Sequence, residues 1–257
     1  MKSIIKTAMV LAALVSLSVQ VSAERSPQNM ARDQYRHPAE TLEFFTIRED
    51  MAVVEISPGG GWYTEVLAAK LSGPLYAAHA NPDSKSAYYQ KSLRRYKDKL
   101  AANPEYYKNV ELRVFDAGAQ LLTTADKSAD AVVTFRNVHN WMNGGNEQVA
   151  FELFFKTLKP GGVLGVVEHR AKPGTDRATM IKSGYVTQDY VVEIAQQAGF
   201  VLEASSEINA NPADSADHPK GVWSLLPNLA MGDVDRERYR AIGESDRMTL
   251  RFRKPAQ

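Results

Sequence analysis

The residues best suited to bind a ligand lie at positions 53–64, which read VVEISPGGGWYT. An apolar, β-branched run leads into an acid, Glu55, and a proline and three glycines follow before an amphipathic run begins. Glycines let a ligand approach the backbone, and the first amides of a helix are free to donate hydrogen bonds to it. The segment predicts a strand, a ligand-binding turn around Gly59 and Gly61, and a helix. An ordinary glycine-rich βα turn has the same pattern.

Polar side chains also follow four later apolar segments. Imidazole and carboxylate groups are among them, and these groups accept hydrogen bonds and exchange protons in many enzyme sites. In chain order the residues are His79 with Asn81, Asp116 with Ala117, the segment Arg136–Trp141, and Glu168 with His169.

Strands and helices alternate along the chain, and this alternation must bring those residues together. The predicted strands span 51–56, 75–79, 110–115, 131–135, 163–168, 200–208 and 248–253. Helical patterns lie between them, and a segment rich in Asn, Pro, Asp and Gly, at about 209–246, separates the last two strands. We therefore predict an α/β fold with a seven-stranded, mostly parallel sheet and helices on both faces. Such sheets bind ligands beyond the carboxyl ends of their strands, where the polar residues fall.

Composition and charge exclude several classes of function. The 257 residues carry a net charge of +1, so no nucleic-acid partner is expected, and the basic run Lys85–Lys99 has the spacing of a solvated helix face. The chain has no cysteine, which excludes disulfides, thiol nucleophiles and thiolate metal sites. Its serines lack the G-x-S-x-G pattern of a hydrolase. His79, His139 and His169 lack local metal-ligand spacing, so no metal is expected.

The N-terminal residues have the pattern of a secretory signal peptide. Lys2 and Lys6 precede an apolar run at 8–17, and Val21-Ser-Ala23 offers small residues at a cleavage site. The run is short for a membrane-spanning helix. We expect a signal peptide at 1–23, a single domain at 24–257 that contains the 209–246 insertion, and a periplasmic or secreted protein without a transmembrane segment after cleavage. An uncleaved N-terminal anchor is the alternative.

Together, these motifs resemble the class I S-adenosylmethionine-dependent methyltransferases. Residues 55–61 match the family's first motif, acid-x-Gly-x-Gly-x-Gly, with Ser57 in place of the first glycine. Asp130 with the strand after it resembles the fourth motif, and Leu158–Gly162 resembles the turn before strand five. The phrases VVEISPGGGWYTEVL, TFRNVHNWM and LRFRKP resemble more narrowly a group of exported bacterial proteins called predicted methyltransferases. The resemblance spans about residues 32–254.

The resemblance implies a Rossmann-like sheet with an antiparallel last strand, and S-adenosylmethionine as the cofactor. The cofactor-binding residues that it implies are Glu55, Ser57, Gly59, Gly61, His79, Asp116, Ala117 and Asn137. Asp116 and Ala117 correspond to the pair that holds the adenine. One position departs from the family, because the acid that usually binds the ribose falls on His79, with Asn81 as its nearest polar neighbour. An imidazole makes one good hydrogen bond there instead of a carboxylate's two, which predicts weak or altered cofactor binding.

The resemblance also implies where a methyl acceptor binds. In the family, the loop after strand four borders the sulfonium and the acceptor, and here that loop contains Arg136–Trp141. His139 is the first candidate for a catalytic base and Glu168 the second. Arg136, Trp141 and His169 are the candidates for the substrate pocket, with Trp141 placed to attract a sulfonium by a cation–π contact. A capped loop with a buried tryptophan and a hydrogen-bonded His139 is the alternative.

These observations predict an exported methyltransferase that acts on a small acceptor molecule, whose identity and the protein's oligomeric state are left open. Its main task would be to align the acceptor with the methyl group and to exclude water. The rival prediction is a non-catalytic extracytoplasmic binding protein on the same fold. It is motivated by the atypical His79 and by export away from the cytosol, where the cofactor is made.

Overall fold

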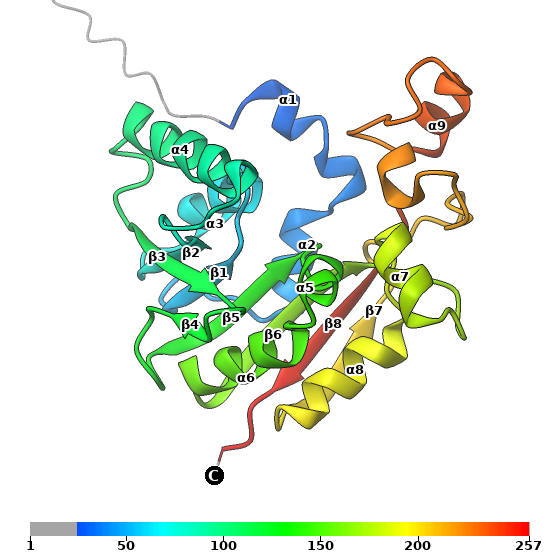
Figure 1. Ribbon diagram of the computed structural model, residues 1–257. Helices are drawn as coiled ribbons and strands as arrows, with labels where there is room; N and C mark the ends of the chain where they lie inside the picture. Colours follow the sequence, from blue (N-terminus) through cyan, green and yellow to red (C-terminus); the bar gives the residue numbers. More distant parts are fainter. Residues whose placement is uncertain (1–24, 257) are drawn as a thin grey trace, which may run out of the picture.

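The computed structural model describes residues 25–256, so the predicted signal peptide at 1–23 lies outside the described residues. The described chain forms an eight-stranded sheet surrounded by helices (Figure 1). The strands are β1 (Val53–Ile56), β2 (Leu75–Ala80), β3 (Val110–Asp116), β4 (Leu121–Leu122), β5 (Ala129–Phe135), β6 (Leu158–His169), β7 (Val201–Ser206) and β8 (Arg247–Arg253).

The helices are short except for α4. They are α1 (Pro27–Met30), α2 (Pro38–Phe44), α3 (Trp62–Lys70), α4 (Ala87–Ala102), α5 (Val138–Gly144), α6 (Glu147–Thr157), α7 (Arg177–Ser183), α8 (Gln188–Gln197) and α9 (Arg236–Ile242), with 3-10 turns at Asp33–Tyr35 and Gly221–Ser224. No helix within residues 25–256 has the length and apolar character needed to cross a membrane.

The order of the strands across the sheet is β4-β3-β2-β1-β5-β6-β8-β7. The central strands β3, β2, β1, β5 and β6 are parallel, and β8 is antiparallel to both β6 and β7. This confirms the predicted Rossmann-like sheet with an antiparallel last strand. The sheet has one strand more than the seven predicted. The additional strand is β4, which contains only Leu121 and Leu122. A strand of two residues is too short to show an alternating pattern in the sequence.

The order in which the chain adds strands to the sheet changes direction beside β1. The chain runs outward from β1 to β2 and β3, and it then returns to β5 on the other side of β1. The carboxyl ends of β1 and β5 therefore border a crevice, which is where open α/β sheets bind ligands. Asn137 joins these two ends, because its Nδ2 donates to the carbonyl oxygen of Ile56 at 3.2 Å and to Oγ1 of Thr134 at 3.1 Å.

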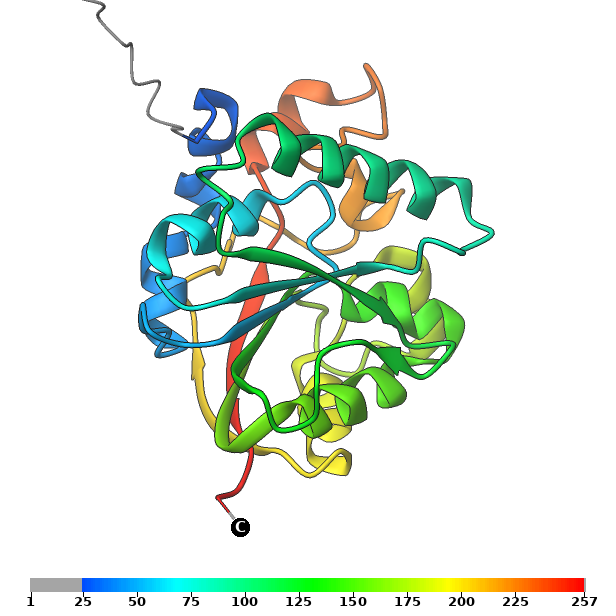
Figure 2. The same ribbon diagram turned by 90° about the vertical axis from the view of Figure 1, so that its left-hand side faces the viewer.

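Neighbouring residues of the central strands pack into two different cores. Val53 and Val133 pack with residues of α2 and α3, whereas Val54 and Val132 pack with residues of α5, α6 and α8. Figure 2 shows α3 and α4 (cyan to teal) on one side of the sheet and α6 and α8 (green and yellow) on the other. A strand that is covered on both faces reads as a continuous apolar run, as the segment before Glu55 does.

The segment after β5 is the helix α5 and not the loop that we predicted. The amides of Val138 and His139 donate to Oε2 of Glu168, at 2.6 and 3.3 Å. A carboxylate that accepts from the first amides of a helix satisfies them and interacts favourably with the helix dipole. Glu168 stands 30 residues from Val138. The local sequence therefore does not show what starts this helix.

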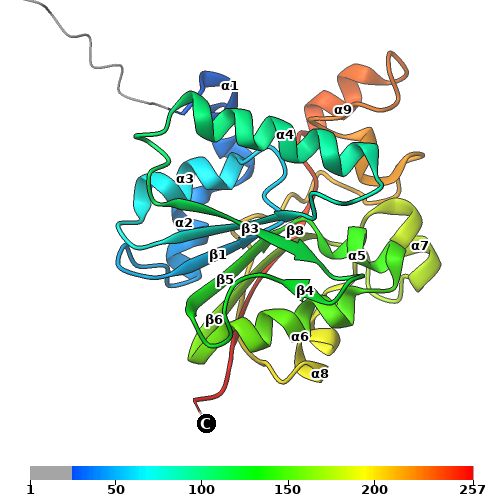
Figure 3. The ribbon, with the colours of Figure 1, turned by 60° about the vertical axis from the view of Figure 1, so that its left-hand side comes forward.

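The N-terminal segment and the 209–246 insertion meet at the carboxyl edge of the sheet. Arg32 and Arg36, from the segment around α1 and α2, both pair with Glu244 near the end of the insertion. The insertion contains the 3-10 turn Gly221–Ser224 and α9, and Figure 3 shows α9 on the same side of the molecule as α7. These two parts of the chain complete the crevice that the strand ends begin.

Candidate active site

Two cavities that share lining residues lie at the carboxyl edge of the sheet. The larger one, which we call the His139 cavity, has a volume of about 420 Å³. Strand ends, the N-terminal segment and the insertion all contribute to it. The lining residues discussed below are Glu55, Ser57 and Gly59 in and after β1, Arg136, Asn137 and His139 after β5, His169 at the end of β6, and Arg32, Arg36, Trp62, Trp223, Glu244 and Arg247 around them.

The smaller one, which we call the Asp116 cavity, has a volume of about 280 Å³ and is lined by Asn81, Asp116 and Ala117 from the ends of β2 and β3. Ser57 and Asn140 line both cavities, so the two spaces adjoin at the turn after β1. Nδ2 of Asn81 donates to Oδ2 of Asp116 at 3.3 Å. The structure thus brings Asp116 and Ala117 together with the turn, as the sequence predicted.

The turn after β1 adopts a backbone conformation that leaves space for a ligand. Gly59 has a φ of +58°, and a Cβ added there would meet nothing within 4 Å. Ser57, in place of the family's first glycine, also has a positive φ, +51°. A non-glycine residue in this region costs about 1–3 kcal/mol, and such strain is often found at binding sites.

Gly61 is placed against α4 and lines neither cavity among the described residues. Its φ is +74°, and an added Cβ would lie 2.9 Å from Cε2 of Tyr96. The position therefore requires glycine for the close approach of α4 to the turn. The ligand contact that we predicted for Gly61 does not fit this placement.

His79 is also directed away from the cavities and is buried, with 3% of its surface exposed. Its Nδ1 accepts from the amide of Ala80 at 2.8 Å, so the proton is on Nε2, which donates to the carbonyl oxygen of Gly59 at 3.1 Å. Burial lowers the pKa of His79, which favours this neutral form. His79 therefore supports the glycine turn, and Asn81 is the polar residue of this strand end that lines a cavity.

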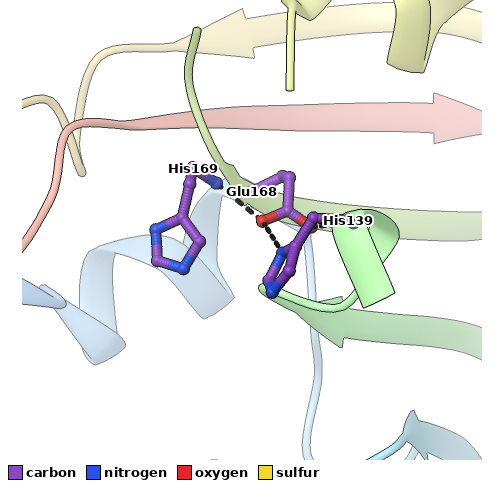
Figure 4. A group of neighbouring side chains, drawn as sticks. All are labelled: His139, Glu168 and His169. Atoms are coloured by element: carbon purple, nitrogen blue, oxygen red, sulfur yellow. Dashed lines mark hydrogen bonds and ion pairs between the residues drawn. The ribbon is translucent and has the colours of Figure 1, made fainter. Parts of the chain in front are cut away.

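Glu168 fixes the tautomer of His139. Oε1 of Glu168 accepts from Nδ1 of His139 at 3.0 Å and from the amide of His169 at 2.8 Å (Figure 4). Nδ1 therefore carries the proton, and Nε2 of His139 is left as the proton acceptor of the ring. Glu168 is fully buried and is not among the residues that line either cavity. The sequence predicted Glu168 as a second catalytic residue, but its position makes it a residue that orients His139.

His169 lies beside His139 in the same cavity. The ring centroids are 5.4 Å apart, and Nδ1 of His169 lies 2.5 Å from Oγ of Ser245. Burial, followed by the neighbouring His139 and the nearby arginines, holds the pKa of His169 well below its ordinary value. His169 is therefore neutral at physiological pH. It can take part in hydrogen bonds to a ligand without adding charge to the site.

His139, Glu168 and His169 form a group whose possible ligand atoms all lie within 4.8 Å of one another, an arrangement that can hold a metal ion. We had expected no metal on the basis of local spacing, and the sequence did not show this grouping. Both oxygens of Glu168, however, already accept N–H bonds from Val138, His139 and His169. The protein's own donors thus occupy the carboxylate that a metal ion would need.

Trp141 lines the Asp116 cavity instead of the His139 cavity. Its ring packs edge-to-face on Phe115 and Phe154, with centroids 5.5 Å from each. Trp62 and Trp223 line the His139 cavity in its place, and Trp223 lies 6.1 Å from the ring of His139. Trp223 belongs to the insertion, where the sequence pattern gave no sign of a contact with the site.

Arginines form one wall of the His139 cavity, around the buried carboxylate of Glu244. Oε1 of Glu244 accepts from Nε of Arg32 at 2.6 Å, and Oε2 accepts from Nε of Arg36 at 3.0 Å and from Nη2 of Arg247. Burial opposes ionisation of Glu244, but the surrounding arginines outweigh it and hold its pKa well below the ordinary value. Of this wall, the sequence predicted only Arg136. The other members come from parts of the chain more than 200 residues apart.

Glu55 is buried at the base of the His139 cavity, with 2% of its surface exposed. Its Oε2 accepts from Oγ1 of Thr64 at 2.6 Å. Burial raises the pKa of Glu55 to about 7, although the Thr64 hydroxyl and the charge of Lys99 act in the opposite direction. The folded protein therefore holds a proton on Glu55 more tightly than the unfolded chain does.

This difference predicts a pH dependence of stability. Since the carboxyl titrates near 4.5 when unfolded and near 7 when folded, the unfolding free energy should fall as pH rises between these values, by about 3 kcal/mol. Glu55→Gln should remove this part of the dependence, whereas Glu49→Gln, at an exposed position, should keep it. Urea unfolding across this pH range measures both. If the unfolding free energy of Glu55→Gln depended on pH as strongly as that of the wild type, the raised pKa of Glu55 would be contradicted.

Comparison with known proteins finds a matching domain model and similar folds. Residues 54–166 match the family model described as a methyltransferase domain. No relative is found among proteins of curated function. The fold is similar to that of an S-adenosylmethionine-dependent methyltransferase from Aquifex aeolicus, with a TM-score of 0.59 and 14% identity over 90% of this chain and 100% of that one.

Two further solved structures are similar. A putative sarcosine dimethylglycine methyltransferase from Galdieria sulphuraria has a TM-score of 0.62 and 14% identity, over 90% of this chain and 87% of that one. The (4+2)-cyclase SpnF has a TM-score of 0.62 and 16% identity, over 86% of this chain and 81% of that one. At these identities the structures show a shared fold alone, and the matched model shows which kind of domain residues 54–166 form. Residues 54–166 of the chain are thus a methyltransferase domain, and the chain has the fold of the S-adenosylmethionine-dependent methyltransferases.

Proposed function

We propose that the protein transfers a methyl group from S-adenosylmethionine to a small molecule bound in the His139 cavity. One observation carries this proposal: Nε2 of His139, left free by the bond from Nδ1 to Glu168, belongs to a residue that lines the larger of two adjoining cavities. Methyl transfer to a protonated acceptor requires a proton acceptor beside the acceptor's space and a neighbouring space for the cofactor, and the second cavity of about 280 Å³ adjoins the first.

The residues around the two cavities fit the cofactor. Asn81 and Asp116 offer polar groups, and Ala117 a small side chain, to the adenosine part in the Asp116 cavity. The open backbone at Gly59 and the shared residue Ser57 lie where the methionine part would pass between the cavities. When bound there, the cofactor supplies a methyl group activated by a sulfonium.

The protein's own residues then act on the acceptor. His139 takes the acceptor's proton at Nε2, and the buried carboxylate of Glu168 stabilises the positive charge that the ring gains. Trp223 and Leu226 of the insertion, together with Trp62, cover the cavity with apolar surface and so reduce access of water. No covalent intermediate with the protein is needed, because the acceptor attacks the methyl carbon directly.

The rival function is a binding protein without methyl transfer. It is favoured by the lack of a carboxylate at the end of β2, where His79 supports the turn and only Asn81 lines a cavity. The similarity to a cyclase agrees with the general rule that a fold does not determine an activity. Both functions place a ligand in the His139 cavity, so measurements of cofactor binding and of methyl transfer are needed to distinguish them.

Cofactor binding tests the Asp116 cavity. In calorimetry of residues 24–257 with S-adenosylhomocysteine, Asn81→Ala and Asp116→Ala should each weaken binding by about 1–3 kcal/mol, because a polar partner is lost. Asp83→Ala is the matched control, since Asp83 is exposed and outside both cavities. Unchanged affinity in both folded variants would refute the placement of adenosine, and a wild type that does not bind would favour the rival function.

Methyl transfer tests His139 and Glu168 separately from binding. With methyl-labelled cofactor and a small-molecule extract as the source of acceptor, His139→Gln should lower the transfer rate about 100-fold or more, the usual contribution of a base. Glu168→Gln should lower the rate more than it changes the KM for the cofactor, because Glu168 orients His139 and lines neither cavity. Glu168→Asp should recover part of the rate. A His139→Gln variant with wild-type transfer would exclude His139 as the base.

We also propose that the protein is exported and acts in the periplasm or outside the cell. The support is the sequence pattern of Lys2, Lys6, the apolar run at 8–17 and the small residues at 21–23. Mass spectrometry of the native protein should find an N-terminus near Glu24 in the periplasmic fraction or the medium. Intact Met1 on protein from the cytosolic fraction would contradict export.

A further inference from the structure

The wall of the His139 cavity carries more positive charge than the residues around it neutralise. Four arginines line the cavity, Arg32, Arg36, Arg136 and Arg247. The acids that line it are Glu244 and Glu55, and burial of Glu55 makes it a partly protonated group near pH 7. The histidine neighbour His169 is held neutral. The described lining therefore has a net positive charge at physiological pH.

Three members of this wall form a rigid, buried frame. Arg36, Arg247 and Glu244 are each about 2% exposed, and Glu244 accepts from both arginines. Trp62 packs against the guanidinium of Arg36, at 4.6 Å from its ring centroid. Even so, Nη1 of Arg36 and Nε of Arg247 have no hydrogen-bond partner within residues 25–256. Buried donors without partners are costly, and both belong to residues that line the cavity, where a bound acceptor of hydrogen bonds would satisfy them.

Arg136 is one of the two partly exposed cations of the wall, with 24% of its side chain exposed against 25% for Arg32. Its guanidinium makes no hydrogen bond to residues 25–256, and its nearest carboxylate oxygen, on Glu244, is 3.9 Å from Nη1. Its backbone has a φ of +63° and is held there by a bond from its amide to the carbonyl oxygen of Val167 at 2.7 Å. The fold thus keeps at the cavity an arginine that has one long ion pair, no hydrogen bond to its guanidinium and a strained backbone, and such strain is common at binding sites.

The charge of the cofactor decides what can neutralise this wall. S-adenosylmethionine has one carboxylate, one ammonium and one sulfonium, so binding it adds positive charge to the site. Guanidinium groups bind carboxylate and phosphate oxygens with paired hydrogen bonds. We propose that the methyl acceptor carries a carboxylate or phosphate group, and that this group binds to Arg136 and Arg36 in the His139 cavity. The inference rests on the proposed function and names the class of its substrate.

The carboxylate of the cofactor itself is the competing occupant, and saturation with S-adenosylhomocysteine separates the two. We would titrate inorganic phosphate and succinate, each at constant ionic strength in chloride, into residues 24–257 that are already saturated with S-adenosylhomocysteine. Calorimetry should show binding of at least one probe. The better of the two identifies whether the acceptor group resembles a phosphate or a carboxylate.

Arg136→Gln should weaken binding of that probe about tenfold or more and leave the affinity for S-adenosylhomocysteine within about twofold. Arg136→Lys should lose less, because it keeps the charge but not the paired hydrogen bonds. Arg238→Gln is the matched control, since this arginine is exposed on α9 and outside the cavity. Circular dichroism of each variant shows that it is folded, and Arg36→Lys replaces Arg136→Gln if the latter is not.

Three results would overturn the inference. The wild type could bind neither probe, or a folded Arg136→Gln variant could bind the probe as tightly as the wild type does. In the third, Arg136→Gln loses affinity for S-adenosylhomocysteine, and S-adenosylhomocysteine excludes the probe from the wild type. The last would show that the arginines hold the cofactor's carboxylate. Absence of S-adenosylhomocysteine binding, with probe binding retained, would instead contradict the proposed function and with it the identification of the anion as an acceptor. The two failures are therefore distinguishable.

Discussion

The buried carboxylate of Glu168 is the interaction on which the rest of the site depends. It accepts hydrogen bonds from the first two amides of α5, from the ring of His139 and from the amide of His169. Each of these donors would be unpaired without it, at a cost of about 1–3 kcal/mol. One side chain thereby sets where α5 begins, which nitrogen of His139 carries the proton and how β6 ends.

A second buried carboxylate, Glu244, has the corresponding role at the other side of the cavity. It joins the N-terminal segment to β8 through Arg32, Arg36 and Arg247. Removing charges from water is expensive, and a buried ion pair is retained only when several partners compensate. Here the carboxylate of Glu244 is neutralised by its arginine partners, whereas the positive charge of the arginines is not fully neutralised by Glu244. The excess charge that results is what distinguishes this cavity from an ordinary apolar pocket.

The sequence predicted the parts of the site that local patterns specify. The periodicity of apolar residues and the turn-forming residues predict the strand that contains Glu55, the glycine turn and the helix after it. Asp116, Arg136 and His139 follow the strands after which they were expected. The roles of His79, Gly61 and Glu168 were not predictable. Each depends on a contact with another element, namely the carbonyl of Gly59, the ring of Tyr96 in α4, and the amides that begin α5. Such contacts leave no periodic signal in the sequence.

The matched domain contains the whole lining of the smaller cavity but only part of the lining of the larger one, to which it contributes Arg136 and His139. Asn81, Asp116 and Gly59 lie within residues 54–166, whereas Arg32, Arg36, Trp223, Glu244 and Arg247 lie outside them. The smaller cavity is therefore encoded in the middle of the gene, and most of the basic wall is encoded at its two ends. Mutation or recombination of the ends can change the shape and charge of the larger cavity, while the middle keeps the smaller cavity together with Arg136 and His139. Descendants of this chain could thus diversify in substrate without altering the half of the site that they share.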